Sequence, residues 1–171
     1  MRLFFALWPD DEVRARLAHW SHELRAVCGG RAMRPENLHV TLAFLGSVED
    51  RRIEEVERAA GEVAPRTLSL VLDQAGYWKH NRIVWAGASA VPPELEELAL
   101  ELRNALARSC IGFDSKPFAS HVTLLRDARE PRAMPELEPI RWEVDGFALL
   151  RSQLQAGGGG YEILTAWKAA A

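Results

Sequence analysis

The sequence predicts a mixed fold of strands and helices, arranged as two pseudo-symmetric lobes that face one another. The tetrapeptide HVTL occurs twice, at residues 39–42 and 121–124, and each copy follows a strand-like and then a helix-like segment. These repeats lie near residues 2–45 and 82–126, which indicates an internal duplication. No linker or low-complexity break divides the chain, so we expect residues 1–171 to form a single two-lobed domain.

The first half of the chain begins with an apolar segment, residues 2–8, that is typical of a buried strand. The sequence PDDE at residues 9–12 then predicts the start of a helix with acidic residues in its first turn. Further patterns predict a strand at 38–45, a helix at 53–63 and a half-buried strand at 67–73. The apolar stripe of the first helix runs through Val13, Leu17, Trp20, Leu24 and Val27.

The second half repeats this order. Residues 82–88 predict a strand, and the proline pair at 92–93 opens a helix with a leucine stripe. The second HVTL strand comes next, and prolines then punctuate a loop between residues 131 and 139. Residues 140–154 and 161–168 each predict a strand, and the glycines at 157–160 predict a flexible hairpin connection between them.

The composition is that of an ordinary globular protein. Apolar residues make up 48% of the chain and charged residues 26%. The net charge of −3 argues against a protein that coats long nucleic acid, because such binding needs a broad basic surface. It is compatible with a small anionic ligand or one nucleic-acid end held by local arginines. Cys28 and Cys110 form no CxxC pair, and the apolar amino-terminal segment is too short for a membrane span or a signal peptide. We therefore expect a cytoplasmic protein with no membrane association.

Each HVTL copy places a histidine and a threonine on one face of a strand. Side chains alternate across a strand, so His39 and Thr41 face one side while the valine and leucine of the tetrapeptide face the other. The same alternation puts His121 and Thr123 together in the second copy. Two such strands that meet across a cleft would form a pocket with two imidazoles and two hydroxyls.

This set of side chains suits a phosphodiester. One neutral imidazole can accept a proton from an attacking water or hydroxyl, while a protonated imidazole donates one to the departing oxygen. The threonine hydroxyls can hydrogen-bond the nonbridging oxygens and orient the phosphorus for in-line attack. Because the two tetrapeptides are identical, the residues alone leave open which histidine is the acid. The pair predicts a bell-shaped dependence of kcat/KM on pH and requires neither a metal nor another cofactor.

Two other interpretations compete with catalysis. A single strand histidine is more often structural, although two copies in matching strand–helix contexts are hard to reach by chance. A two-histidine metal site is the second alternative, but neither tetrapeptide has a nearby Cys, Asp or Glu at ligand spacing.

The paired motifs, HVTLAFLG from His39 and HVTLLR from His121, resemble the HxTx pair of the two-histidine phosphoesterase superfamily. Within it, the chain is most similar to the bacterial and archaeal RNA 2′,3′-cyclic phosphodiesterases, historically called 2′-5′ RNA ligases. The opening MRLFFAL, the segment RIVWAG and the closing YEILTAWK extend the resemblance along nearly the whole chain. It implies a bilobal α+β fold in which each lobe is an antiparallel sheet backed by helices, with the active site in the cleft.

The resemblance also implies an activity and a role for each motif residue. The activity is hydrolysis of a 2′,3′-cyclic phosphate at an RNA end to a 2′-phosphomonoester. In this family His39 would be the proton donor to the leaving 3′ oxygen and His121 the proton acceptor that activates water, while Thr41 and Thr123 hold the phosphate. The expected partners are RNA ends with a cyclic phosphate, tRNA-derived ends among them, and the expected state is a monomer.

Phe44 and Arg126 each lie five residues after a histidine, where the family has a stacking aromatic residue and a phosphate-binding arginine. Strict alternation would put both side chains on the face opposite the histidines. Either each strand ends or bulges first, or the two are core and surface residues. An arginine in an otherwise apolar strand needs an anionic partner, which favours substrate binding for Arg126.

The sequence leaves several alternatives open. The reverse reaction, 2′-5′ ligation of RNA, uses the same acid and base, and a small cyclic phosphate or a 2′-5′ oligonucleotide is an alternative substrate. A noncatalytic RNA-end or nucleotide-binding module belongs to another class, although it would not need an intact acid–base pair. His80, in a predicted loop beside Tyr77 and Trp78, either stacks on a base or packs against the protein.

Overall fold

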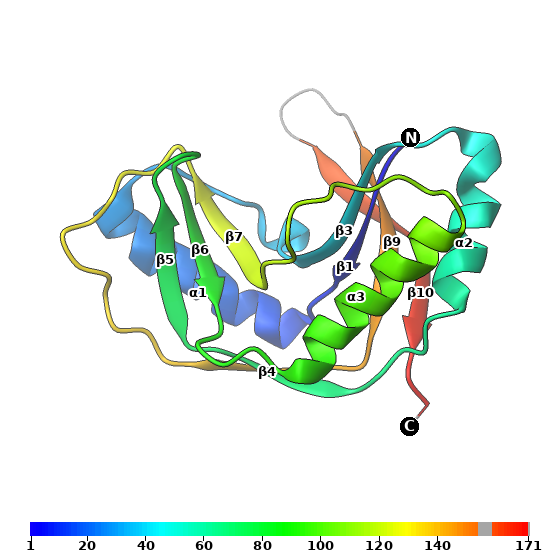
Figure 1. Ribbon diagram of the computed structural model, residues 1–171. Helices are drawn as coiled ribbons and strands as arrows, with labels where there is room; N and C mark the ends of the chain where they lie inside the picture. The colour runs from blue at the N-terminus through cyan, green and yellow to red at the C-terminus, as the bar shows by residue number, and fades with distance from the viewer. Residues whose placement is uncertain (154–158, 171) are drawn as a thin grey trace.

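The computed structural model describes residues 1–153 and 159–170 of the chain. Within these residues, strands and α-helices follow one another in the order that Figure 1 shows. Their bounds are β1 (Arg2–Leu7), α1 (Asp11–Cys28), β2 (Arg31–Ala32), β3 (Val40–Ser47), α2 (Ile53–Gly61), β4 (Leu68–Leu72), β5 (Gln74–Trp78), β6 (Ile83–Gly87), α3 (Pro93–Arg108), β7 (His121–Arg126), β8 (Ile140–Val144), β9 (Gly146–Gln153) and β10 (Gly160–Lys168).

The apolar stripes of the two long helices are buried, with one difference from the prediction. Asp10 caps α1, because its carboxylate accepts a hydrogen bond of 2.8 Å from the backbone N–H of Val13. The first four residues of the predicted α1 stripe are buried, but Val27 is 42% exposed and Cys28 is buried in its place. After Leu24 the apolar stripe continues at Cys28, four residues later, and not at Val27, three residues later. Val27 therefore faces solvent. The leucine stripe predicted for α3 consists of Leu95, Leu98, Leu102 and Leu106, and all four are buried.

The main sheet has two halves that meet at its centre. The strand order is β10-β9-β1-β3-β7-β6-β5, with β2 paired to β7 beside this path, and neighbouring strands are antiparallel. Among the described residues, β3 and β7 pair only at Val40 and Val122, and the two halves diverge from this point (Figure 1). The prediction of a bilobal α+β fold with antiparallel sheets is confirmed.

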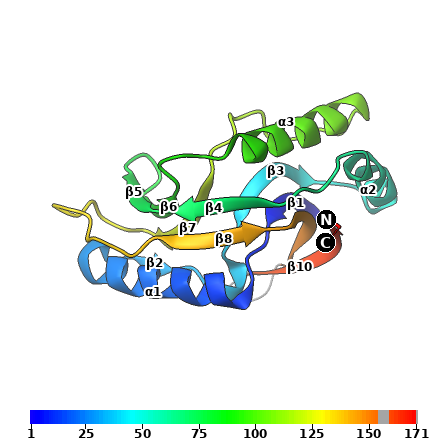
Figure 2. The same ribbon diagram turned by 90° about the horizontal axis from the view of Figure 1, so that it is seen from below.

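Each long helix crosses from one half of the sheet to the other. The strand before the helix belongs to one half, and the helix packs against the opposite half. Helix α1 follows β1 but packs against β6, β7 and β8, while α3 follows β6 but packs against β3 and α2. Figure 2 shows α1 and α3 on opposite sides of the two-stranded sheet of β4 and β8. The buried side chains of these elements form one large apolar cluster. Because the helices are exchanged in this way, the two lobes share a core.

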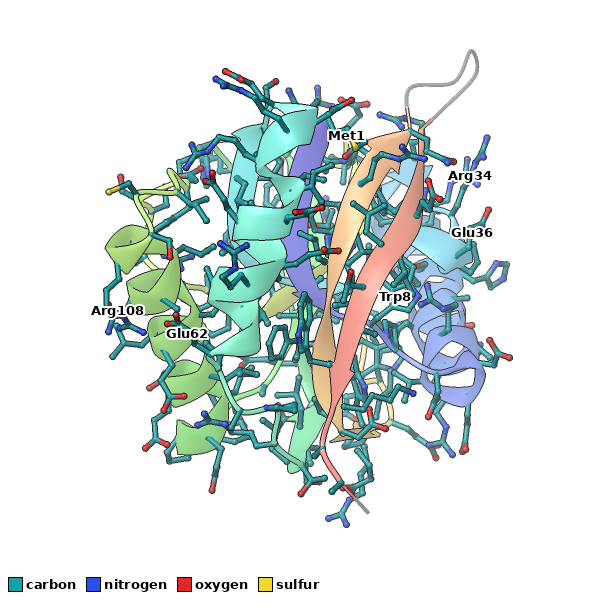
Figure 3. All side chains as sticks on the ribbon, turned by 90° about the vertical axis from the view of Figure 1, so that its right-hand side faces the viewer. Met1, Trp8, Arg34, Glu36, Glu62 and Arg108 are labelled. Atoms are coloured by element: carbon teal, nitrogen blue, oxygen red, sulfur yellow. The ribbon has the colours of Figure 1, made fainter. Side chains whose placement is uncertain are left out.

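The outer surface carries ion pairs between elements and few exposed apolar side chains. An ion pair of 3.3 Å between Arg108 of α3 and Glu62, which follows α2, connects the ends of these helices (Figure 3). Such an exposed pair contributes little to stability. No helix in the described part of the chain combines the length and the apolar character that a bilayer crossing needs.

Two predicted segments differ from the structure. The predicted strand at 140–154 is two strands, because β8 ends at Val144, β9 begins at Gly146 and they belong to different sheets. The Asp-Gly dipeptide between them is a turn signal. Strand β5 was not predicted, since Gly76 interrupts its apolar pattern; here the Trp85 ring lies so close that a Cβ on Gly76 would be 2.1 Å from it. The predicted connection at 157–160 lies partly outside the described residues, and β9 and β10 beside it are paired.

Candidate active site

The two HVTL segments lie side by side at the centre of the sheet. Their valines are paired partners and are fully buried. Extending this antiparallel register by one residue in each direction places His39 opposite Thr123 and Thr41 opposite His121. Each histidine therefore has one threonine two residues away on its own strand and another across the strand pair.

A cavity of about 310 Å³ lies on this face of the sheet and is lined by both histidine–threonine pairs. This is the face that strand alternation predicts for them. Phe44 and Arg126 also line the cavity, so the structure brings all six predicted residues together. The other lining residues are Phe4, Met33, Asn37, Trp78, Asn81, Ile83, Ser152 and Tyr161.

Two bulges explain why Phe44 and Arg126 share the face of the histidines. The pairing of β3 with β1 shifts register at residues 42–43, and the pairing of β7 with β6 shifts at residues 124–125. At both places two consecutive apolar residues are fully buried. Each bulge adds one residue to the strand and so returns the next side chain to the cavity. The two motifs thus carry the same local irregularity at the same position.

Each histidine is held by the carbonyl group two residues before it. The Nδ1 atom of His39 lies 2.7 Å from the carbonyl oxygen of Asn37, and that of His121 lies 2.8 Å from the carbonyl oxygen of Ala119. A carbonyl oxygen only accepts, so Nδ1 carries the proton and donates it in both rings. In the neutral form of each ring, Nε2 is therefore the nitrogen without a proton. The Oγ1 atom of Thr41 lies 3.0 Å from Nε2 of His39, which joins the first pair directly.

Aromatic side chains surround His39 and control its protonation. The ring centroids of Phe4, Tyr161 and Trp8 lie 4.9, 5.3 and 6.1 Å from that of His39. Burial disfavours the charged ring and lowers the pKa of His39 from 6.5 to about 4, against the opposing effect of its carbonyl hydrogen bond. Nearby positive charge, including that of Arg126, lowers this pKa further.

His121 has a similar environment on the other half of the sheet. Its ring lies edge-on to Trp78 with a centroid distance of 4.5 Å, and Trp78 in turn lies 5.6 Å from Trp85. Burial lowers the pKa of His121, while the hydrogen bond to its carbonyl partner acts in the opposite direction. Both rings are therefore mainly neutral at pH 7, and a bound anion would favour protonation of one of them.

The charge of the lining suits an anionic ligand. Arg126 provides a guanidinium group, and none of the described lining residues is Asp, Glu or Cys. Two neutral imidazoles without a third ligand make a poor divalent-metal site. Among the described residues, no cluster of three or more His, Cys, Asp or Glu side chains could hold a metal ion.

Sequence reasoning missed three lining residues that touch or surround His39. Phe4 and Tyr161 come from opposite ends of the chain, and they lie near each other because β9 joins β1 to β10. Asn37 is buried, and its side-chain amide donates a hydrogen bond to the carbonyl oxygen of Gly159. The sequence shows a polar residue two positions before His39, but the burial of Asn37 becomes evident only in the structure.

Proteins of known family match this chain along nearly its whole length. A family model described as "LigT like Phosphoesterase" matches residues 7–85. The RNA 2′,3′-cyclic phosphodiesterase of Escherichia coli (strain K12) is 37% identical over 168 residues, which cover 97% of this chain and 95% of that protein. The protein of the same name from Thermus thermophilus is 34% identical, and the match covers 96% of this chain and 88% of that protein.

Solved structures with the same fold are also similar in sequence. The structure of E. coli LigT complexed with 3′-AMP superposes with a TM-score of 0.89 at 35% identity, and it covers 99% of this chain and 98% of that chain. The structure of the Thermus thermophilus protein TT0787 has a TM-score of 0.83 at 31% identity, with 98% and 97% covered.

Proposed function

The chain belongs to the LigT-like phosphoesterase family, and on this premise we propose that it hydrolyses the 2′,3′-cyclic phosphate at RNA ends to a 2′-phosphomonoester. Relatives along almost its whole length are named RNA 2′,3′-cyclic phosphodiesterase, so the chain is a phosphoric diester hydrolase. The observation that carries the mechanism is that two imidazoles, one from each HVTL strand, line a single cavity. Both rings are fixed through Nδ1, which leaves Nε2 for proton transfer.

The phosphate is bound by hydroxyl groups and one cation. The hydroxyls of Thr41 and Thr123 donate hydrogen bonds to the nonbridging oxygens, and the guanidinium of Arg126 balances the negative charge. Phe44 supplies an apolar surface for the ribose or base. These contacts hold the phosphorus between the two histidines and so replace a bimolecular encounter by a fixed geometry.

The chemical step is an in-line displacement with two proton transfers. Nε2 of His121 accepts a proton from water as the water oxygen bonds to phosphorus. The bond from phosphorus to the 3′ oxygen breaks, and protonated His39 donates its Nε2 proton to that oxygen. The products are a 2′-phosphomonoester and a 3′-hydroxyl, and the two histidines return to their first protonation states by exchange with solvent.

His39 takes up the proton that it donates from solvent when the substrate binds. Its pKa is about 4 without a ligand, so the ring is neutral at pH 7. A phosphodiester anion beside the ring stabilises the imidazolium and raises this pKa in the complex. His39 can therefore donate a proton at pH 7 only when a phosphate is bound. Without a phosphate, its low pKa keeps the ring neutral.

The pH dependence of kcat/KM follows from the two lowered pKa values. This parameter reports the ionisations of the free enzyme, and the active form carries one proton on the histidine pair. We expect a bell with an acidic limb near pH 4 and an alkaline limb below pH 6.5, because burial lowers both pKa values from 6.5. Activity therefore rises as the pH falls below neutrality and is lost as the pH falls through the acidic limb. Initial rates with adenosine 2′,3′-cyclic phosphate measure this profile, and an optimum above pH 7 or a monotonic profile would contradict it.

Chelators are expected to leave the rate unchanged. The proposed step uses two imidazoles, two hydroxyls and a guanidinium, and the described lining provides no carboxylate or thiolate to hold a divalent metal. Turnover of the same substrate should be equal after dialysis against EDTA and after addition of Mg²⁺, Mn²⁺ or Zn²⁺. Loss of activity in EDTA that a metal restores would refute this part of the mechanism.

The internal symmetry supports an origin by duplication of one strand–helix–strand unit. The orders β1-α1-β3 and β6-α3-β7 are alike, and both final strands are bulged directly after the motif threonine. Both histidines donate from Nδ1 to the carbonyl two residues earlier. On this proposal residues 1–171 form one two-lobed domain in which each copy contributes half of the acid–base pair.

The finer biological assignments rest on the activity for which the relatives are named, on the two cysteines and on the exposed apolar residues. We assign RNA ends, including tRNA-derived ends, as substrates, and a monomeric enzyme in the cytoplasm. Cys28 and Cys110 are free thiols, which supports a reducing compartment. The large exposed apolar residues in the described part of the chain are scattered, at Met1, Val27, Leu100 and Ile163, which supports a monomer.

The direct test uses an oligoribonucleotide with a 2′,3′-cyclic phosphate end. The expected product carries a 2′-phosphate, because the 3′ oxygen is the leaving group. A 3′-phosphate product would reverse the assignment of the leaving oxygen. Binding without any turnover would instead identify a noncatalytic module.

A further inference from the structure

Trp85 of β6 lies on the same face of the sheet as the cavity that holds both histidines. It is paired with Thr123 of β7 on one side and with Gly76 of β5 on the other, and directly paired residues share a face. These three strands lie side by side in Figure 1. Trp85 is absent from the described lining of the cavity, and its Nε1 atom is buried. The indole therefore lies beside the site without reaching the substrate.

Two glycines make room for the Trp85 ring. The six-membered ring of the indole lies between them, so that a Cβ on Gly76 would be 2.1 Å from Cζ2 and a Cβ on Gly87 would be 2.8 Å from Cζ3. A larger residue at either position would have to displace the ring or its own strand. Gly87 is also the residue paired with His121, so the indole fills the space that a side chain beside the imidazole would otherwise take.

The Trp85 ring supports the aromatic contact of His121. The ring of Trp78 contacts both, with a centroid distance of 5.6 Å to Trp85 and 4.5 Å to His121. Trp78 comes two residues after Gly76 on β5, so both face the same side of the sheet. Trp78 is half-buried, and without the indole beside it the ring would be free to turn away from His121.

The contribution of Trp85 comes from its ring and not from its N–H group. The buried Nε1 atom has no hydrogen-bond acceptor among the described residues. A buried donor without a partner lowers the stability of the fold. The indole is therefore held in place by the packing of its ring against Trp78 and the two glycines.

We propose that Trp85 is a positioning residue for His121, because its ring, set between two glycines, holds Trp78 against the imidazole. This inference rests on the proposed function, in which Nε2 of His121 accepts a proton from the attacking water. The hydrogen bond from Nδ1 to the carbonyl oxygen of Ala119 fixes one edge of the imidazole, and the contact with Trp78 fixes its plane. Together these two contacts direct Nε2 at the attacking water.

The pKa of His121 gives a direct measure of this arrangement. Burial lowers this pKa, and the Trp78 ring is part of what buries the imidazole. A rise of the pKa toward 6.5 in a variant therefore reports a loss of burial, provided that the surrounding charges are kept. The charged and histidine side chains that line the spaces around His121 are unchanged in the variants below: His39, His80, Arg103, Asp114, Lys116 and Arg126.

An NMR titration of the imidazole resonances, in the protein without ligand, tests the proposal. In Trp85→Leu the pKa of His121 should rise toward 6.5, while that of His39 should stay near 4. Gly76→Ala should have the same effect with both tryptophans kept, because either the indole or strand β5, which carries Trp78, must move. Spectra of His39→Ala and His121→Ala assign the resonances.

Two matched variants control for a general loss of packing. Trp167→Leu removes a half-buried tryptophan that stacks on a phenylalanine of β9, and Gly61→Ala adds a methyl group in open space. Both should leave the pKa of His121 unchanged. An unchanged pKa in Trp85→Leu, or an equal rise in Trp167→Leu, would overturn the proposal. If Trp85→Leu does not fold, the comparison of Gly76→Ala with Gly61→Ala decides in the same way.

Kinetics with adenosine 2′,3′-cyclic phosphate connect the proposal to the reaction. In Trp85→Leu kcat should fall by about 10–100-fold, the cost of misplacing a catalytic group by about 1 Å. KM should change less, because the indole does not line the described cavity, and the alkaline limb of kcat/KM should move to higher pH with the pKa of His121. A wild-type kcat in this variant would overturn the positioning role. Failure of the wild type to hydrolyse the substrate would refute the proposed function, while the titration would still decide whether Trp85 controls the surroundings of His121.

Discussion

Replacing either His39 or His121 with alanine is expected to lower kcat by about 10²–10⁴-fold, the usual contribution of one general acid or base. Both rings line the same cavity and have Nδ1 engaged by a carbonyl, so no other described nitrogen in the lining can take their place at the same position. His22→Ala is the matched control, since His22 is exposed on α1 and does not line the cavity. It should retain wild-type kcat.

The pH profiles of the two histidine variants distinguish their roles. Loss of the base in His121→Ala should remove the acidic limb and leave a rate that falls as the pH rises through the pKa of His39, about 4. Loss of the acid in His39→Ala should remove the alkaline limb and leave a rate that falls as the pH drops through the pKa of His121, which lies below 6.5. If the two variants lose the opposite limbs, the roles are exchanged, and if either retains full activity, the two-histidine mechanism is wrong.

Replacing Thr123 with valine is the change with the next largest expected effect. Its hydroxyl is proposed to hydrogen-bond a nonbridging oxygen as charge develops there, and removal of one such donor typically costs about 10²–10³-fold in kcat. Valine has nearly the same shape, so the strand and its bulge remain. Thr123→Ser keeps the hydroxyl and should recover most of the activity.

Steady-state kinetics with the cyclic phosphate measure this effect. Thr67→Val, at an exposed residue before β4, is the matched control for the loss of a threonine hydroxyl. Thr41→Val should be at least as severe as Thr123→Val, because Oγ1 of Thr41 also contacts Nε2 of His39. An active Thr123→Val enzyme with a raised KM alone would show that the hydroxyl stabilises the bound ground state and the transition state equally, and so does not raise kcat.

The face on which each motif residue lies could be predicted because it depends only on local geometry. Alternation along a strand placed His39 with Thr41 and His121 with Thr123, and all four line one cavity. The positions of Phe44 and Arg126 were left open, since a bulge depends on pairing with neighbouring strands. The signal was nevertheless present: residues 42–43 and 124–125 are consecutive apolar pairs that interrupt the alternation.

The arrangement of the helices could not be predicted from their sequences. An apolar stripe establishes that one side of α1 is buried, but it carries no information on which strands cover that side. The structure packs α1 against the half of the sheet that contains β7. The residues around His39 were missed for a related reason, because Phe4 and Tyr161 become neighbours only through the strand order of the whole sheet.

In the proposed mechanism, two imidazoles from opposite lobes act on a single phosphorus atom. A crystal structure of the protein with adenosine 2′-monophosphate, the product class, tests it most directly. We expect one phosphoryl group with the Nε2 atoms of His39 and His121 both at hydrogen-bond distance from its oxygens, and the adenosine on the His39 side. A phosphate that contacts only one of the two rings, or that binds outside the cavity between the lobes, would contradict it.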